Sequence, residues 1–482
     1  MIKYITIIAC SFAFSADGIA QTAAEYYQQA NDFRTQRNWQ KAVSLYDLAI
    51  QKDSTYAPAY QNKASTLFEL GKQEQALQVM QKAVSLQPKS STVYVERGKL
   101  QIRREYYENA ILDFDEAIEL QPQSIAAYYY RGEANLAAEH PEVATKDFGK
   151  VVELLSLNSD VTTKQYPKLY TNLGFAQRLT GDFEWAIVNL QKAIVLNPND
   201  AEAYYHLGVI KSGSRDYNLG IMNFDKALQL DNKYTIAFYQ RGLAHYSNKN
   251  YKAAIQDFSS VLVEAPASNS AYIARGYAYA DLGKHKNAIK DYDAALALAP
   301  NDDATFIRKG FSQMALKDYT AAQATFGKAV DLDGKYKPFA YNNRAEATYK
   351  LGKYDQALED INTSISIDSL NAHAYYNRAV VYSHKGRFAL ILSAPQSASS
   401  QEDSPAGTID HNRLAQRDFD RAIELNNQVA AFYFDRADLY YRKGLYEAAI
   451  ADWNRVQELD PKYKTKETKK ALKAATKKFM EG

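Results

Sequence analysis

Side chains that could carry out catalysis are present in the sequence, but their spacing matches no known catalytic arrangement. The single cysteine, Cys10, lies among the first twenty residues. No HExxH, GxSxG, P-loop or GxGxxG motif occurs, so the sequence offers no zinc-hydrolase, acyl-transfer or nucleotide site. The histidines are scattered without ligand spacing: His140, His206, His245, His285, His373, His384 and His411. We therefore expect neither catalytic residues nor a metal or cofactor, and predict that the protein is not an enzyme.

Arginine and aspartate, in contrast, recur in a fixed relation. Seven arginines are each followed by an aspartate at one constant separation, except for a single pair in which the separation is longer. The pairs are Arg97/Asp113, Arg131/Asp147, Arg241/Asp257, Arg275/Asp291, Arg344/Asp360, Arg378/Asp418 and Arg436/Asp452. Such a series could be a ladder of ligand-binding arginines or a set of structural ion pairs. The choice depends on the elements that carry them.

These elements follow an internal repeat. The segment Ala126–Gly132 (AAYYYRG) returns as Ala271–Gly276 (AYIARG) and as Ala374–Ala379 (AYYNRA), and the period settles at about 34 residues. Twelve copies cover almost the whole chain, beginning at Ala23, Ala57, Ser91, Ile125, Pro167, Ala201, Thr235, Asn269, Asp303, Pro338, Ala372 and Ala430. Such a period is typical of a repeat architecture in which each copy packs on its neighbours.

Within each copy the same positions carry small or large residues. Counting from the first residue of a copy, positions 8 and 20 hold Gly or Ala in all twelve, as in Gly98 and Ala110. Position 24 holds a large residue such as Phe114. Two antiparallel helices approach closely only where one face lacks bulk, so these columns predict a helix pair in every copy. Glycines near position 15 suit the turn between the two helices: Gly71, Gly181, Gly283, Gly352, Gly386 and Gly444.

This pattern resembles the tetratricopeptide repeat. The resemblance implies an all-α, right-handed superhelical solenoid of antiparallel helix pairs over residues 23–463. Repeat positions 7 and 23 are equally far from the turn at position 15, so they should face each other across the pair. We predict that the arginines and aspartates at these positions form partly buried ion pairs inside each repeat, because Leu173 and Leu207 at position 7 occur together with Asn189 and Asn223 at position 23.

Three segments depart from the period. Residues 159–166 are additional and should lengthen a loop, and residues 389–409, rich in Ser, Pro and Ala, should be a disordered insertion in repeat eleven. Residues 464–482 are rich in lysine, and Leu472, Ala475 and Phe479 are spaced as an apolar stripe. We predict a helix that caps the last repeat, with weak contact to an anionic surface as an additional role.

Residues 1–20 are typical of a signal peptide. Lys3 precedes an uncharged apolar stretch from Ile5 to Ala16, and small residues follow up to Ala20. The apolar stretch is shorter than the roughly 20 residues needed to span a bilayer. We predict export to the periplasm or surface of a Gram-negative bacterium, with an uncleaved anchor, a buried helix or a lipoprotein modified at Cys10 as alternatives.

The resemblance also implies a binding groove lined by the first helices, at repeat positions 2, 5, 9, 12 and 13. Carried onto this sequence, these positions give the candidate groove residues Tyr129, Tyr205, Tyr239, Tyr246, Tyr277, Phe311, Tyr349, Tyr376, Phe434 and Tyr441. Tyrosine combines a large contact area with a hydroxyl group and suits recognition, although each of these rings could equally be a packing residue.

The charge balance narrows the class of partner. With 58 basic and 56 acidic residues, the chain has no strong attraction for nucleic acid. We predict an exported scaffold or adaptor that binds a protein or peptide, without a membrane span. The alternatives are an envelope-associated structural protein that contacts anionic polymer or lipid through its Lys-rich tail, and a non-catalytic subunit of an envelope enzyme complex.

Overall fold

The computed structural model describes residues 21–157, 163–332, 334–392 and 410–481 of the chain. These residues form α-helices and one short 3-10 helix, η1 (Thr163–Gln165), with no strand among them. The chain divides into two compact units, Met1–Asn232 and Lys233–Gly482. The predicted signal peptide, residues 1–20, lies outside the described residues, and so do residues 158–162 of the lengthened loop.

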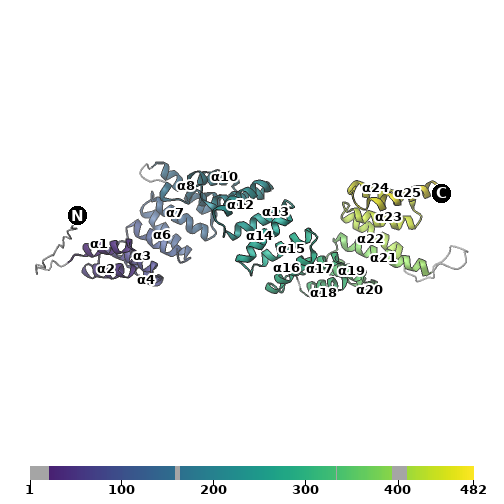
Figure 1. Cartoon of the computed structure of the whole chain (residues 1–482), viewed down its shortest axis with the longest axis horizontal. Coiled ribbons are helices and arrows are strands. Elements are labelled where there is room, and N and C mark those ends of the chain that lie inside the picture. The colour runs from purple at the N-terminus through teal and green to yellow at the C-terminus, as the bar shows by residue number, and fades with distance from the viewer. Residues whose placement is uncertain (1–20, 158–162, 333, 393–409, 482) are drawn as a thin grey trace, which may run out of the picture. The chain divides into compact units, whose positions relative to one another are not determined.

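The helices follow one another as twelve antiparallel pairs, and Figure 1 shows each pair against the next within a unit. The first unit contains α1 (Ala23–Thr35), α2 (Trp39–Lys52), α3 (Ala57–Glu69), α4 (Gln73–Leu86), α5 (Ser91–Ile102), α6 (Tyr107–Leu120), α7 (Ile125–Ala137), α8 (Pro141–Leu157), α9 (Leu169–Thr180), α10 (Phe183–Leu196), α11 (Ala201–Gly213) and α12 (Tyr217–Leu230).

The second unit continues the series with one helix beyond the last pair. It contains α13 (Thr235–Ser247), α14 (Tyr251–Glu264), α15 (Asn269–Asp281), α16 (His285–Leu298), α17 (Asp303–Ala315), α18 (Tyr319–Asp331), α19 (Lys337–Lys350), α20 (Tyr354–Ile367), α21 (Ala372–Leu392), α22 (His411–Leu425), α23 (Ala430–Arg442), α24 (Tyr446–Leu459) and α25 (Thr465–Glu481). The prediction of an all-α solenoid of tetratricopeptide repeats is confirmed.

Small residues allow the two helices of a pair to approach each other, as the sequence predicts. A Cβ placed on Gly98 would lie 2.6 Å from the ring of Phe114, and one on Gly276 would lie 2.5 Å from the ring of Tyr292. Both distances are shorter than a carbon–carbon contact allows. Glycine at position 8 therefore makes room for the aromatic ring at position 24 of the same repeat.

The turn inside each pair requires a left-handed residue at position 15. Glycine occupies position 15 in five repeats, with φ between 75° and 84°. In six other repeats a larger residue, such as Arg37 or Lys317, takes this position with φ between 59° and 66°. The prediction that Gly386 also forms a turn is wrong, because Gly386 lies inside α21. The inserted residues remove the need for a tight turn at this point, so the helix continues.

The predicted start of the insertion is wrong for the same reason. The sequence pattern places the loop at residues 389–409, but α21 continues to Leu392. Residues 389–392 read Ala-Leu-Ile-Leu, and both alanine and leucine are strong helix formers. Residues 393–409 lie outside the described residues.

The last helix, α25, packs against α24. Ala475 and Thr468 are fully buried, and Ala475 belongs to one apolar cluster with Ala437, Ala449 and Trp453. Leu472 contacts this cluster, whereas Phe479, the third residue of the predicted stripe, is 52% exposed. No helix in the described part of the chain is both long enough and apolar enough to cross a membrane.

Candidate functional site

The regularly spaced arginines bind the aspartates of their own repeats. In each of the seven pairs, Nε and Nη2 of the arginine donate to the two carboxylate oxygens of the aspartate, at 2.5 to 3.0 Å. Six of the aspartates are buried, for example Asp291 at 5% exposure. The predicted structural ion pair is confirmed, and two donor groups of each guanidinium are therefore occupied.

The arginines also make contacts that the sequence analysis missed. In five repeats Nη1 donates to repeat position 25 of the preceding repeat, as from Arg275 to Ser259 (3.0 Å) and from Arg436 to Asp420 (2.7 Å). The guanidinium carbon also lies 5.2 to 5.7 Å from the centre of the aromatic ring at position 4 in all seven repeats. The recurrence of an acceptor at the same separation before each of these five arginines was the available signal. Each of them joins two repeats and is part of the scaffold, not of a ligand site.

The candidate groove residues differ in how much surface they leave for a ligand. Tyr129 and Tyr205 are buried, at 5% and 7% exposure, and pack on Phe148 and Phe224 of their own repeats. Tyr239 packs on Phe258 in the same way and is half-buried. All three rings cover the core aromatic at position 24, as Tyr277 and Phe311 also do in their repeats. What distinguishes Tyr129 and Tyr205 is that their burial leaves little surface for a ligand.

Three other candidates meet in one cleft of the second unit. Tyr246 of α13, Tyr277 of α15 and Phe311 of α17 line an open cleft of about 460 Å³. Phe311 is the most open of the three, at 50% exposure. The remaining lining residues are Ala280, Asp281, His285, Tyr292, Arg308 and Ser312. The first helices of three consecutive repeats thus supply an aromatic surface with charged groups beside it.

The polar groups of this cleft are held in defined positions. The hydroxyl of Tyr246 donates to Asp281 (2.6 Å), and burial together with this carboxylate raises the pKa of Tyr246 above its usual value. The guanidinium of Arg308 lies 4.1 Å from the centre of the Tyr277 ring. Nδ1 of His285 is buried and has no hydrogen-bond partner among the described residues. The cleft can therefore offer a cation, a carboxylate and aromatic faces to a bound chain.

The four remaining candidates lie in the later repeats. Tyr349 and Tyr376 line a small cavity of about 80 Å³ beside Glu346. The hydroxyl of Tyr376 donates to Asp435 (2.5 Å), and burial raises the pKa of both Asp435 and Glu346. This cavity is much smaller than the aromatic cleft of about 460 Å³.

The last two candidates pack near the capping helix. Phe434 contacts Tyr463, and Tyr441 contacts Tyr446 and Trp453. Within the second unit, the candidates therefore do not all line one pocket. Among the described residues no group of three or more His, Cys, Asp or Glu side chains could hold a metal ion.

Comparisons with known proteins assign the repeats to a family. The model described as TPR repeat matches residues 178–212. Two models described as tetratricopeptide repeat match residues 57–90, 91–124 and 201–234, and residues 239–303, 308–366, 342–390 and 409–464. Together these matches cover more than half of the 482 residues.

Characterised relatives match over short stretches. The TPR repeat-containing protein MJ1428 of Methanocaldococcus jannaschii is 29% identical over 142 residues, which are 30% of this chain and 20% of that protein. The STIP1 homolog of Dictyostelium discoideum is 34% identical over 76 residues, 16% of this chain and 14% of that protein. The chain thus spans less than a quarter of the length of these relatives.

Solved structures of similar proteins include MamA from Desulfovibrio magneticus, with 28% identity, a TM-score of 0.33 and coverage of 35% of this chain and 94% of that one. The Cut9 and Hcn1 hetero-tetramer of the APC/C gives 13% identity and a TM-score of 0.43, over 94% of this chain and 96% of that one. On the evidence of the repeated sequence matches and the stacked helix pairs, this chain belongs to the tetratricopeptide-repeat proteins.

Proposed function

We propose that the protein is an exported scaffold that binds an extended segment of a partner protein across the first helices of its second unit. The observation that carries this proposal is the cleft in which Tyr246, Tyr277 and Phe311 converge with Arg308 and Asp281. Repeat proteins of this family provide surfaces for protein–protein interaction. The proposed role is therefore that of a binding scaffold.

The chemistry of the cleft favours a peptide with mixed character. The half-buried rings of Tyr246 and Tyr277 and the exposed ring of Phe311 can contact apolar side chains. Fixed aromatic rings lose little conformational entropy on binding and are often the residues that contribute most to affinity. Arg308 and Asp281 would orient charged groups of the peptide at either side.

A photo-crosslinking experiment tests this proposal. A photoreactive phenylalanine analogue at Phe311 should capture a distinct partner in intact cells, and Tyr277→Ala in the same chain should abolish the capture. The matched control places the analogue at Val263, an equally apolar residue on α14 that is 76% exposed. Equal capture at both positions, or capture that survives Tyr277→Ala, would contradict a binding role for the cleft.

Export to the periplasm or cell surface of a Gram-negative bacterium is part of the same proposal. It rests on Lys3, the apolar stretch from Ile5 to Ala16 and the small residues that end at Ala20. The intact mass of the protein recovered from the cell envelope should correspond to a chain that begins at Gln21. A full-length mass that retains Met1 or a lipid on Cys10 would replace this with one of the two anchored alternatives.

A second candidate function concerns the Lys-rich helix α25. Lys469, Lys473 and Lys477 line one face of it, and Met480 is 81% exposed. This surface favours contact with an anionic lipid or envelope polymer. Because α25 covers Trp453, removing the helix would damage the fold, and the sharper test replaces the three lysines by glutamine. Vesicles containing phosphatidylglycerol should then bind the variant less well than the natural chain.

If the partner that is crosslinked at Phe311 is an enzyme, the chain is instead the non-catalytic subunit of that enzyme.

A further inference from the structure

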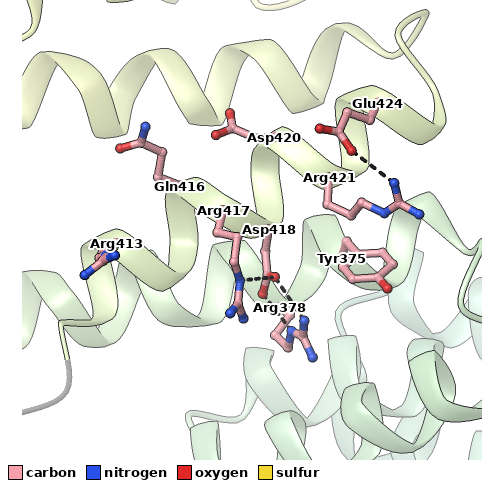
Figure 2. A pocket seen from close by; sticks show the side chains of 9 residues that line it. All are labelled: Tyr375, Arg378, Arg413, Gln416, Arg417, Asp418, Asp420, Arg421 and Glu424. Atoms are coloured by element: carbon pink, nitrogen blue, oxygen red, sulfur yellow. Dashed lines mark hydrogen bonds and ion pairs between the residues drawn. The ribbon is translucent and has the colours of Figure 1, made fainter.

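A second surface, made by the helices α21 and α22, carries a row of arginines. The two helices line an open cleft of about 690 Å³, and Figure 2 shows the side chains that line it. Tyr375 and Arg378 line it from α21. The residues from α22 are Arg413, Gln416, Arg417, Asp418, Asp420, Arg421 and Glu424. This cleft is separate from the aromatic cleft of repeats seven to nine.

The arginine row is unique to repeat eleven. Arg413, Arg417 and Arg421 are spaced by one helical turn each, so they lie on one face of α22. They occupy repeat positions 18, 22 and 26, and no other repeat has a basic residue at all three positions. The fold therefore does not require these arginines, since the other repeats form the same helix without them.

Most other charges in the cleft are already neutralised by neighbours. Arg378 donates to both carboxylate oxygens of Asp418 and, through Nη1, to Asn362. Asp420 accepts from Arg436 at 2.7 Å. Arg421 pairs with Glu424 at 3.0 Å, as drawn in Figure 2.

Two guanidinium groups of the cleft make no close salt bridge. Arg417 makes only a 3.7 Å contact with Asp418, which Arg378 already occupies, and its side chain is 67% exposed. Arg413 is exposed and forms no salt bridge with any described residue. It also lies in the first turn of α22, whose N-terminus is already capped by Asp410, which accepts from the backbone N–H of Arg413 at 3.0 Å. A bound anion would relieve the remaining positive charge of the two guanidinium groups.

The spacing and the surroundings indicate which anion fits. Successive arginines of the row are separated along the helix axis by about 6 Å, close to the roughly 6.6 Å between alternate side chains of an extended peptide. A guanidinium binds a carboxylate through two parallel hydrogen bonds. On the neighbouring second helices, Asp355, Glu359 and Glu447 are exposed at the equivalent positions. A long polyanion would lie across these acids, whereas a short peptide would not.

We propose that the α21–α22 cleft binds an extended acidic peptide segment whose Asp or Glu residues alternate with small residues, through Arg413 and Arg417. This site lies on a different surface from the aromatic cleft of the proposed function and does not depend on it. It would give the scaffold a second, charge-selective contact.

Fluorescence anisotropy of a labelled peptide tests the proposal on the full chain. The probe alternates glutamate with serine, and its control carries glutamine in place of every glutamate. The double variant Arg413→Gln and Arg417→Gln should weaken binding of the acidic probe about tenfold or more. The matched variant Lys286→Gln and Lys290→Gln, at positions 18 and 22 of repeat eight, should change it less than about twofold.

The helical signal by circular dichroism and the melting temperature of both variants should equal those of the natural chain, because the four side chains are on the surface. Equal weakening by the two double variants would show only general charge attraction and would overturn the proposal. Absence of binding to the acidic probe at about 1 mM, a concentration typical of very weak complexes, would also overturn it. Tighter binding of a single-stranded oligonucleotide with the same dependence on Arg413 and Arg417 would identify a polyanion site instead.

Discussion

Repeats five and six, from α9 to α12, fill repeat position 7 differently from repeats seven and eight, from α13 to α16. Leu173 and Leu207 occupy this position in the first region, each at 5% exposure. Arg241 and Arg275 occupy it in the second region and bind Asp257 and Asp291. The same helix pair forms in both regions.

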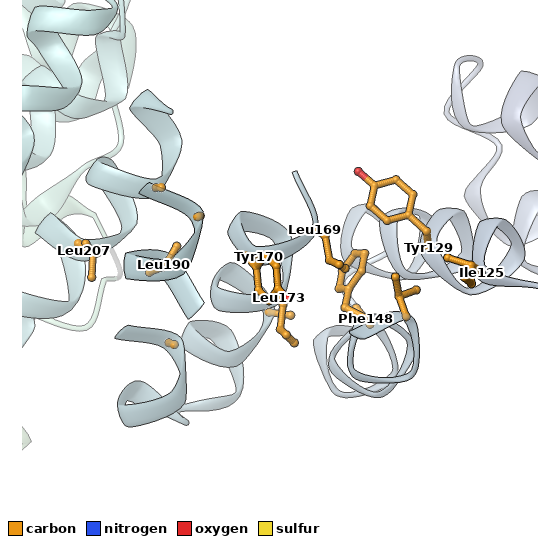
Figure 3. Close-up of a cluster of buried hydrophobic side chains, with 14 of the residues drawn as sticks. Ile125, Tyr129, Phe148, Leu169, Tyr170, Leu173, Leu190 and Leu207 are labelled. Carbon is orange, nitrogen blue, oxygen red and sulfur yellow. The ribbon is translucent and has the colours of Figure 1, made fainter. Parts of the chain in front are cut away.

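The apolar core is also connected differently in the two regions. Figure 3 shows Leu173 and Leu207 in one cluster of buried side chains that extends from Ile125 to Ile210, across repeats four to six. In repeats seven and eight the buried residues form smaller clusters, one around Phe258 and another around Val261. The ion pair alone does not divide the core, because repeat four carries Arg131 and Asp147 and still belongs to the continuous cluster.

The partner at position 23 changes together with position 7. Asn189 donates to Gln177 (2.8 Å) and to the carbonyl of Trp185 (3.1 Å), and Asn223 donates to the carbonyl of Leu219 (2.8 Å). Each asparagine is satisfied within its own repeat without an arginine. The comparison teaches that the helix pair can form without the ion pair. Where an arginine occupies position 7, however, it needs the aspartate at position 23, and the aspartate needs the arginine.

The largest expected effect comes from removing one half of a pair. Asp291→Ala would leave Nε and Nη2 of Arg275 without acceptors in a region where the arginine side chain is only 19% exposed. An uncompensated charge of this kind costs about 3 kcal/mol or more. Urea unfolding should show this loss, and hydrogen exchange should place it in α15 and α16.

Asp293→Ala is the matched control. Asp293 lies on the same helix and pairs with Lys309, but its side chain is 52% exposed. The control should lose less than about 1 kcal/mol. If both variants lose the same amount, the pair at positions 7 and 23 is not a buried structural pair.

The sequence predicted these ion pairs because position 7 and position 23 vary together, and it predicted the fold because Gly and Ala recur at positions 8 and 20. The third contact of the arginines was missed, because it joins different repeats through several residue types, such as Ser259 and Asp420, and only their constant separation from the arginine indicates it. The sequence also could not distinguish the candidate groove tyrosines that are buried from those that line the cleft. Tyr205 and Tyr277 look alike in sequence, and only packing buries the first and leaves the second in the cleft.

Acid should destabilise repeat six, because it protonates the buried side chain of His206. This side chain is 7% exposed and stacks on Phe175, with ring centres 4.5 Å apart. Burial lowers the pKa of His206 to about 3, and Arg178 and Lys168 add to the effect. The folded state therefore favours the neutral ring. This preference for the neutral ring contributes its full free energy of folding at pH values above 6.5, the pKa of histidine in the unfolded chain. The contribution is lost as the pH falls from 6.5 towards 3, the pKa in the folded chain.

His206→Gln removes the titrating group and isolates this effect. One proton contributes up to about 1.4 kcal/mol per pH unit, so the natural chain should lose about 3 kcal/mol more than the variant between pH 7 and pH 4. Protection factors of the α11 amides at both pH values measure the difference. Parallel loss in the two proteins would show that His206 is not buried in its neutral form.

The smallest effect is expected from converting repeat eight to the pattern of repeats five and six. The double change Arg275→Leu and Asp291→Asn removes both charges together, and replacing a buried ion pair by uncharged residues is often nearly neutral. Ser259 would lose Arg275 but keep its own bond to the carbonyl of Ile255 (2.7 Å). The new amide at position 291 could donate to the carbonyl one turn earlier, as Asn223 does.

We expect the double variant to unfold within about 1 kcal/mol of the natural chain, while Arg275→Leu and Asp291→Asn alone each destabilise it more. The two single changes and the double change form a thermodynamic cycle, measured by urea unfolding, that reports the coupling between the two residues. Additive losses would mean that the leucine of repeats five and six is tolerated only in their own surroundings. A strongly non-additive result would mean that the two kinds of repeat are interchangeable at this position, and that the ion pair is not needed to hold the repeat together.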